Sequence, residues 1–161
     1  MTEIEVKIKL KSLAPLLQQL KALGAQKIKE RYFETNTLYD FPSRELLQKR
    51  SALRVRKINK KCFLTYKGPP LPSRSFKIRE EYETEVKNEK QLRKILKKLG
   101  LKQTFSYAKY RTVYRLQRLK IYVDETPIGN FIELEGKQSD IVKIAKLLGY
   151  SRRDFIKKDY I

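Results

Sequence analysis

Histidine is absent from this 161-residue chain, and cysteine occurs once, at Cys62. Without histidine the protein cannot use a His-based catalytic triad, a His proton shuttle or a His metal ligand. A single cysteine excludes a disulfide within the chain and any zinc site of Cys and His ligands, and it favours a reducing compartment. Any catalysis must therefore rely on carboxylates, lysine, tyrosine or a bound metal.

Long apolar runs and low-complexity linkers are also missing. The N-terminus opens on charged residues instead of an apolar signal segment, and no apolar run approaches the length needed to cross a bilayer. We therefore expect a soluble, cytoplasmic protein that does not interact with membranes. The length suits a single domain over residues 1–161, which needs neither a disulfide nor a metal merely to fold.

Negative charge is scarce, since 18 acidic residues face 38 basic ones and give a formal net charge of +20. Such an excess indicates an anionic partner, either a small polyphosphate or a nucleic acid. Much of the lysine also fits a solvated surface of the kind found in heat-adapted proteins. Charge alone does not choose between these partners.

The first residues that carry chemistry are Glu3, Glu5 and Lys7. Side chains alternate between the two sides of a strand, so these three share one face while apolar residues occupy the other. Two carboxylates beside a cation suit a divalent metal held against a phosphate. The same spacing recurs twice, at residues 83–87 and 133–137.

Hydrophobic periodicity predicts helices over residues 12–23, 43–49, 88–99 and 139–148. In the third of these, Leu92, Ile95, Leu96 and Leu99 are expected to be buried. Strands are expected over residues 3–9, 26–33, 37–39, 52–57, 62–67, 76–86, 107–116, 120–124 and 130–135. Short turns separate these strands, which indicates a mostly antiparallel sheet built from hairpins.

Nearly every expected strand has one apolar face and one charged face. An antiparallel sheet with one face in water gives the same alternation. Here, however, the polar positions are concentrated in Arg, Lys, Glu and Asp on strand after strand, which favours a closed barrel with a polar interior. The candidate lining residues are the cations Lys7, Arg54, Arg56, Lys67, Lys109 and Arg111 and the carboxylates Glu3, Glu5, Asp124, Glu133 and Glu135.

Charge counting is compatible with a loaded interior. The cations contribute about +6 and the carboxylates about −5. Two divalent metals and a triphosphate would leave the total near +1, which avoids the cost of uncompensated buried charge.

Assembled in this order, the motifs resemble those of the CYTH family of triphosphate tunnel metalloenzymes, whose members include class IV adenylyl cyclases and thiamine triphosphatases. The likeness covers essentially the whole chain. It depends on Glu3-Ile4-Glu5-Val6-Lys7, Leu53-Arg54-Val55-Arg56, Leu64-Thr65-Tyr66-Lys67-Gly68-Pro69, Arg79-Glu80-Glu81-Tyr82-Glu83, Lys109-Tyr110-Arg111, Asp124 and the segment 129–136.

The resemblance implies an α+β fold, namely an eight-stranded, mostly antiparallel closed β-barrel with helices packed on its outside. It implies that the tunnel binds a triphosphate with one or two Mg²⁺ or Mn²⁺ ions. By position, it makes Glu3, Glu5, Asp124, Glu133 and Glu135 metal ligands and Lys7, Arg54, Arg56, Lys67, Lys109 and Arg111 phosphate binders. We expect Glu5, Lys7, Lys109 and Arg111 to be catalytic.

Several alternatives stay open at this point. Attack by a ribose hydroxyl would make the protein a cyclase, whereas attack by water would make it a triphosphatase. The substrate is a nucleotide, thiamine triphosphate or tripolyphosphate, and the roles of Glu81, Glu83 and Glu85 and of a C-terminal cation at Lys157 or Lys158 are undecided. The rival class is a non-catalytic protein that binds polyphosphate, nucleotide or RNA. Ten Tyr and seven Phe could stack on the bases of an RNA. Most of these aromatic residues, however, share strand faces with aliphatic residues and therefore fit a core. The sequence predicts no oligomeric state.

Overall fold

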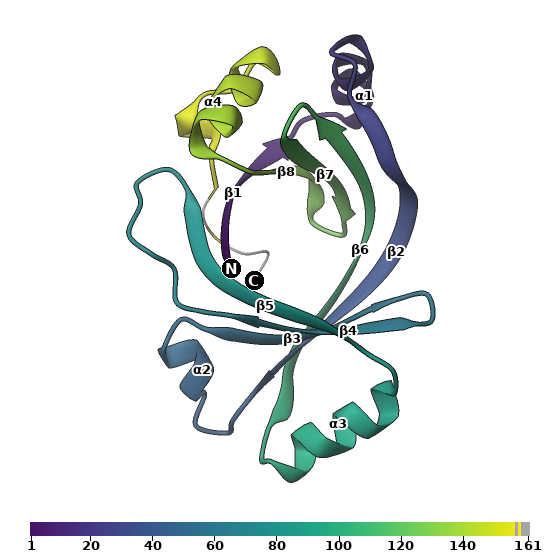
Figure 1. Ribbon diagram of the computed structural model, residues 1–161, viewed down its shortest axis with the longest axis vertical. Helices are drawn as coiled ribbons and strands as arrows, with labels where there is room; N and C mark the ends of the chain where they lie inside the picture. Colours follow the sequence, from purple (N-terminus) through teal and green to yellow (C-terminus); the bar gives the residue numbers. More distant parts are fainter. Residues whose placement is uncertain (157, 159–161) are drawn as a thin grey trace. The chain divides into compact units, whose positions relative to one another are not determined.

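The computed structural model describes residues 1–156 and 158 (Figure 1). In this part of the chain, eight strands form a closed barrel in the order β1-β5-β4-β3-β2-β6-β7-β8, and the pairs with a defined register are antiparallel. The expected α+β fold class is therefore confirmed. The elements are β1 (Thr2–Leu10), α1 (Leu13–Ala22), β2 (Gln26–Asp40), α2 (Glu45–Gln48), β3 (Ala52–Ile58), β4 (Lys61–Lys67), β5 (Lys77–Val86), α3 (Glu89–Lys98), β6 (Lys102–Leu116), β7 (Leu119–Thr126), β8 (Gly129–Glu135), α4 (Gln138–Leu147) and the 3-10 helix η1 (Arg152–Asp154).

The chain divides into two compact units. Unit 1 comprises Met1–Thr2, Phe33–Leu71 and Arg79–Ala108, and unit 2 comprises Glu3–Tyr32, Pro72–Ile78 and Lys109–Ile161. Whether they behave as one domain stays a prediction. None of the helices in residues 1–156 and 158 has the length and apolar character needed to span a membrane.

Unit 2 has an apolar core between its strands and two helices. Leu16 and Leu20 of α1 and Ile141 and Ile144 of α4 pack with the apolar residues of β1, β7 and β8, so both helices cover the same side of these strands (Figure 1). Every one of these four side chains is at most 2% exposed. Because strand side chains alternate, the opposite side of the same strands is left to the charged residues.

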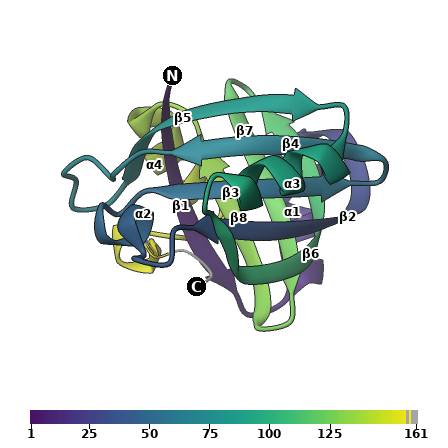
Figure 2. The same ribbon diagram turned by 90° about the horizontal axis from the view of Figure 1, so that it is seen from below.

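Unit 1 has a smaller core, in which α3 lies across strands β2, β3 and β4 (Figure 2). Leu92 and Leu96, one helical turn apart, supply the buried contact. The expectation that Ile95 and Leu99 are also buried is wrong, because they are 54% and 66% exposed. A single i, i+4 stripe touches the strands, so the wider apolar face that the sequence predicts is only half used.

Three expected strands differ from those observed. The stretches 26–33 and 37–39 are one continuous strand, β2, and β6 begins five residues before its expected start. Residues 34–36 lie between the two expected strands, yet Glu34 and Asn36 are completely buried within β2. Asn36 donates to Glu34 Oε1 and accepts from Arg56, and Arg56 lies 3.7 Å from the same Glu34 oxygen, so these contacts offset part of the cost of burial.

Asp40 ends β2 and caps the short helix that follows. Its carboxylate accepts hydrogen bonds from the backbone N–H groups of Phe41, Leu46 and Leu47 at 2.7, 3.0 and 3.0 Å. Burial raises the pKa of this carboxyl, but the three N–H donors outweigh burial and bring the net pKa below its ordinary value. The cap thereby fixes the connection between β2 and β3, the strands that carry the polar residues of unit 1.

Candidate active site

Three carboxylates of unit 2 gather at the β1–β8 pair. Glu5 lies directly opposite Glu135 in the register, and Glu3 lies two residues along β1 on the same face. One carboxylate oxygen from each of Glu3, Glu5 and Glu135 lies within 4.8 Å of the others. Like charges placed directly opposite on neighbouring strands repel each other, so this arrangement requires a compensating cation.

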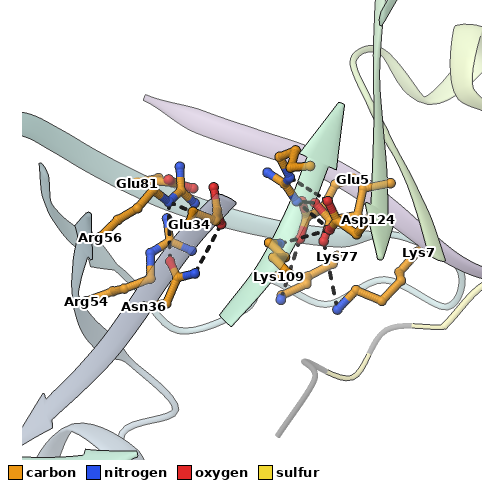
Figure 3. Close-up of polar contacts among 12 residues, drawn as sticks. Glu5, Lys7, Glu34, Asn36, Arg54, Arg56, Lys77, Glu81, Lys109 and Asp124 are labelled. Carbon is orange, nitrogen blue, oxygen red and sulfur yellow. Dashed lines mark hydrogen bonds and ion pairs between the residues drawn. The ribbon is translucent and has the colours of Figure 1, made fainter. Parts of the chain in front are cut away.

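Lys77 supplies part of that compensation. Its Nζ lies 3.5 Å from Oε1 of Glu5, and both side chains are largely buried (Figure 3). The donor set, made only of carboxylate oxygens, is of the kind that Mg²⁺ and Mn²⁺ prefer, so the residues present fit a divalent ion.

Arg111 and Lys109 of β6 converge on Asp124 of β7. Arg111 donates from Nε and Nη2 to the two oxygens of Asp124 at 2.6 and 2.7 Å. Lys109 donates to Oδ2 of Asp124 at 2.8 Å (Figure 3). Arg111 Nη2 also donates to Glu133 at 2.7 Å. All four side chains are buried. Short, charge-assisted and partly bidentate bonds of this kind hold the guanidinium in one orientation.

Lys7 lies opposite Glu133 in the register, with 4.0 Å between Nζ and Oε1. The C-terminal segment reaches the same lysine, since the backbone N–H of Ile156 donates to the Lys7 carbonyl at 2.7 Å. Lys7 Nζ in turn donates to the Lys158 carbonyl at 3.5 Å. Lys158 thus meets the site through its backbone, while its side chain is exposed; Lys157, the other predicted C-terminal cation, lies outside the described residues.

Tyr122 forms part of the same polar face of unit 2. The Arg111 guanidinium carbon lies 4.3 Å from the centroid of its ring. Burial raises the pKa of the Tyr122 hydroxyl, and the carboxylates of Glu135, Glu3 and Glu133 raise it further against the opposing effect of Arg111. The phenol therefore stays neutral at physiological pH and braces Arg111 without adding charge.

The polar face of unit 1 is built around Arg54 and Arg56 of β3. Glu83 lies 3.8 Å from Arg54 and 4.0 Å from Arg56, and it accepts a hydrogen bond from the Thr65 hydroxyl at 2.6 Å. These ion-pair distances exceed normal hydrogen-bond lengths. The two guanidiniums are therefore held less tightly by carboxylates than Arg111 is in unit 2.

A buried relay of Glu34 and Asn36 supports Arg56. Asn36 donates from Nδ2 to Glu34 at 3.1 Å and accepts from Arg56 Nε at 3.3 Å (Figure 3). Arg54 is only 8% exposed, and its Nε has no hydrogen-bond partner among the described residues. A buried guanidinium donor without an acceptor is costly, and an anionic ligand would satisfy it.

Lys67 and Arg79 have different surroundings. Lys67 lies opposite Glu81, with 3.3 Å between Nζ and Oε2. Arg79 donates to the backbone carbonyls of Gly68 and Arg50 at 2.7 and 3.0 Å, so it fixes two loops. Glu81 and Glu83 serve as counter-ions to cations in this structure.

The structure brings the predicted site residues together within each unit. Glu3, Glu5, Lys7, Lys109, Arg111, Asp124, Glu133 and Glu135 share the polar face of unit 2, and Arg54, Arg56 and Lys67 lie in unit 1. The close trio of carboxylates does not include Asp124 or Glu133, whose role as metal ligands stays a prediction. Four further polar residues of these faces are not among the site residues predicted from the sequence, namely Lys77, Glu34, Asn36 and Tyr122. Lys77 shares strand parity with Arg79 and Glu81, which could have revealed it.

Comparison with known proteins agrees with this arrangement. The CYTH domain profile matches residues 1–158. A Methanocaldococcus jannaschii protein named as a candidate adenylate cyclase is 33% identical over 100% of this chain and 97% of its own length. Among solved structures, a Pyrococcus horikoshii protein superposes with a TM-score of 0.84 at 26% identity, covering 98% of this chain and 96% of its own.

Two further structures are more distant in sequence. A candidate adenylate cyclase of Vibrio parahaemolyticus gives a TM-score of 0.88 at 20% identity, over 99% of this chain and 95% of its own. A Hippeastrum protein is named as a candidate adenylyl cyclase and described as having a dominant triphosphatase activity. It gives a TM-score of 0.68 at 24% identity, over 91% of this chain and 88% of its own. At these identities the two matches support the fold.

Proposed function

This chain belongs to the CYTH domain family, and from that premise we propose that it is a metal-dependent enzyme that binds a triphosphate and breaks one of its phosphoanhydride bonds. The observation that carries the proposal is the carboxylate trio of Glu3, Glu5 and Glu135, which lies on the same face of unit 2 as Lys7 and Arg111. Hard oxygen ligands beside fixed cations suit a metal bound to phosphate.

The cations divide into two kinds. Lys7, Lys109 and Arg111 are buried in unit 2, and Arg111 is oriented by Asp124 and Glu133. We assign Lys7, Lys109 and Arg111 to binding phosphate and to stabilising the charge that develops as the bond breaks. Arg54, Arg56 and Lys67 of unit 1 bind phosphate in the same proposal, with the guanidinium forks as bidentate ligands.

The carboxylate trio would hold one Mg²⁺ or Mn²⁺ ion, with Glu5 central because Lys77 already fixes its position. A bound divalent ion supplies Lewis-acid stabilisation of phosphate oxygens. Asp124 and Glu133 act in this proposal mainly as the counter-ions that position Arg111, Lys109 and Lys7. Their removal would therefore affect the cations before it affects the metal.

The product distinguishes cyclisation from hydrolysis. Purified protein is incubated with ATP, GTP, thiamine triphosphate or tripolyphosphate and with Mg²⁺, Mn²⁺ or EDTA, and cyclic nucleotide is resolved from orthophosphate and pyrophosphate. Metal-dependent release of any of these products supports the proposal. No turnover of any triphosphate with either metal would refute it.

A second candidate function, non-catalytic RNA binding, is favoured only by the net charge of +20. Binding across many phosphates weakens steeply as salt rises, because counterions are released. Binding of one triphosphate through a metal depends instead on Mg²⁺ or Mn²⁺. Titrations with a single-stranded RNA and with tripolyphosphate, each at two salt concentrations and with and without metal, separate the two functions.

A further inference from the structure

Two aromatic rings on β6 lie outside both apolar cores of the described chain. Phe105 is 41% exposed, and its ring centroid lies 6.1 Å from that of Tyr107, with the planes inclined at 39°. Neither ring is among the residues that pack in the core of unit 1. Our expectation that the aromatic residues are mostly core does not hold for this pair.

Tyr107 faces the polar side of unit 1. Its hydroxyl interacts with the Arg54 guanidinium and, with Glu34 and Glu81, outweighs burial to leave the pKa of Arg54 above its ordinary value. Strand alternation puts Phe105 on the same side as Tyr107. The ring pair therefore begins beside the guanidinium that carries the unsatisfied, buried Nε donor.

This juxtaposition has a specific chemical meaning. A guanidinium donor that lacks an acceptor suits a phosphate oxygen, and a neighbouring ring pair that includes the exposed Phe105 suits a flat aromatic group attached to that phosphate. Inorganic tripolyphosphate has no such group. A nucleoside triphosphate has one, the nucleobase.

Resting on the proposed function, we infer that Phe105 and Tyr107 form a stacking subsite for the nucleobase of a nucleoside triphosphate. The chain then prefers nucleotides to tripolyphosphate. Every base has a flat π-face, so stacking alone distinguishes nucleotide from inorganic substrate more strongly than one base from another.

The test compares kcat/KM for ATP with kcat/KM for tripolyphosphate, both with Mn²⁺. Phe105→Leu and Tyr107→Leu each lower the ratio about tenfold, as expected when one stacking interaction is lost. Tyr107→Phe keeps the ring and stays close to the wild-type ratio. Phe33→Leu is the matched control, since Phe33 is also in unit 1 and 47% exposed but lies next to the inward Glu34 and so on the opposite side of β2.

Thermal unfolding of each variant checks that the fold is kept. A ratio that stays at the wild-type value in both leucine variants, or falls equally in Phe33→Leu, overturns the inference while leaving the proposed function in place. If wild-type protein turns over neither substrate, the proposed function fails. In that case calorimetry measures, for each variant, the Kd of a non-hydrolysable ATP analogue and the Kd of tripolyphosphate. The ratio of these two Kd values then replaces the ratio of kcat/KM values, and the same outcomes decide the subsite.

Discussion

The arginines of the two units are held in different ways. In unit 2, Arg111 donates to Asp124 at 2.6 and 2.7 Å and to Glu133 at 2.7 Å. In unit 1, the carboxylates nearest to Arg54 and Arg56 lie 3.7 to 4.0 Å away. A guanidinium that is hydrogen-bonded to carboxylates is fixed before a ligand arrives, whereas one whose carboxylates are farther away loses less when a phosphate replaces them.

The difference suggests a division of labour. Unit 2 combines the carboxylate trio with cations whose positions are already set, as charge stabilisation in a transition state requires. Unit 1 offers cations that exchange a distant carboxylate for a ligand, as substrate binding requires. Substitutions in unit 2 should therefore affect stability and turnover, and those in unit 1 should affect mainly KM.

The largest effect is expected from Asp124→Asn in unit 2. Asp124 is completely buried, and its loss leaves Lys109 and Arg111 as buried charges with one carboxylate fewer. Removing one partner of a buried pair costs about 3–5 kcal/mol of unfolding free energy. Urea unfolding of the variant and of wild-type protein measures this loss of free energy.

The matched control for this variant is Glu125→Gln. Glu125 is the next residue of β7 and pairs bidentately with the half-exposed Arg31, so its loss should cost at most about 1 kcal/mol. If the two variants lost the same unfolding free energy, burial would not determine the strength of these ion pairs.

Glu5→Gln should abolish most turnover without unfolding the protein. It removes one of the three oxygens of the carboxylate trio and the partner of Lys77. We expect Mn²⁺ affinity and turnover to fall by about a hundredfold or more. Calorimetric Mn²⁺ titration and the product assay measure these quantities, again with Glu125→Gln as control. Unchanged Mn²⁺ affinity would remove the trio from the metal site.

Asp40→Ala should weaken unit 1 in a pH-dependent manner. Because the folded pKa of Asp40 is lowered, its stabilisation is present above the unfolded pKa near 4 and is lost as pH falls through the folded value. We expect the variant to lose about 1 kcal/mol at pH 7 and to converge on wild type in acid. Urea unfolding at pH 7 and pH 3 checks this, and a difference that grows towards acid would contradict the sign.

The smallest effect is expected from Glu83→Gln in unit 1. Its ion pairs with Arg54 and Arg56 are long, and its side chain is 35% exposed. Loss of the Glu83 carboxylate frees both arginines for phosphate, so KM for tripolyphosphate should fall. An exposed ion pair contributes up to about 1 kcal/mol, which corresponds to a change in KM of up to about fivefold. A large loss of turnover instead would make Glu83 part of the catalytic machinery.

Much of the fold was predictable because strand parity is a local property. Alternation in β1 correctly put Glu5 and Lys7 on the face opposite Val6 and Ile8, and Ile8 is buried in the core while Glu5 joins the carboxylate trio. Helix existence followed from periodicity in the same way. The exposure of Ile95 and Leu99 did not, because the width of the buried stripe depends on how α3 lies on its strands.

The site was predicted as a set of residues but not as a set of pairs. Which side chains meet depends on strand register, and the register put Glu5 opposite Glu135 and Lys7 opposite Glu133. Lys77 and the Glu34–Asn36 relay were missed for a related reason. The sequence does not show which side chain of another strand each of these residues meets.

Calorimetric titration of tripolyphosphate into wild-type protein, with Mn²⁺ and with EDTA, tests most directly whether the carboxylate trio and its neighbouring cations bind a metal and a triphosphate together. We predict that the affinity for tripolyphosphate is at least about tenfold higher with Mn²⁺ than with EDTA and that Glu5→Gln removes this difference. Affinity that is the same with and without metal, and that falls steeply with salt alone, would contradict it.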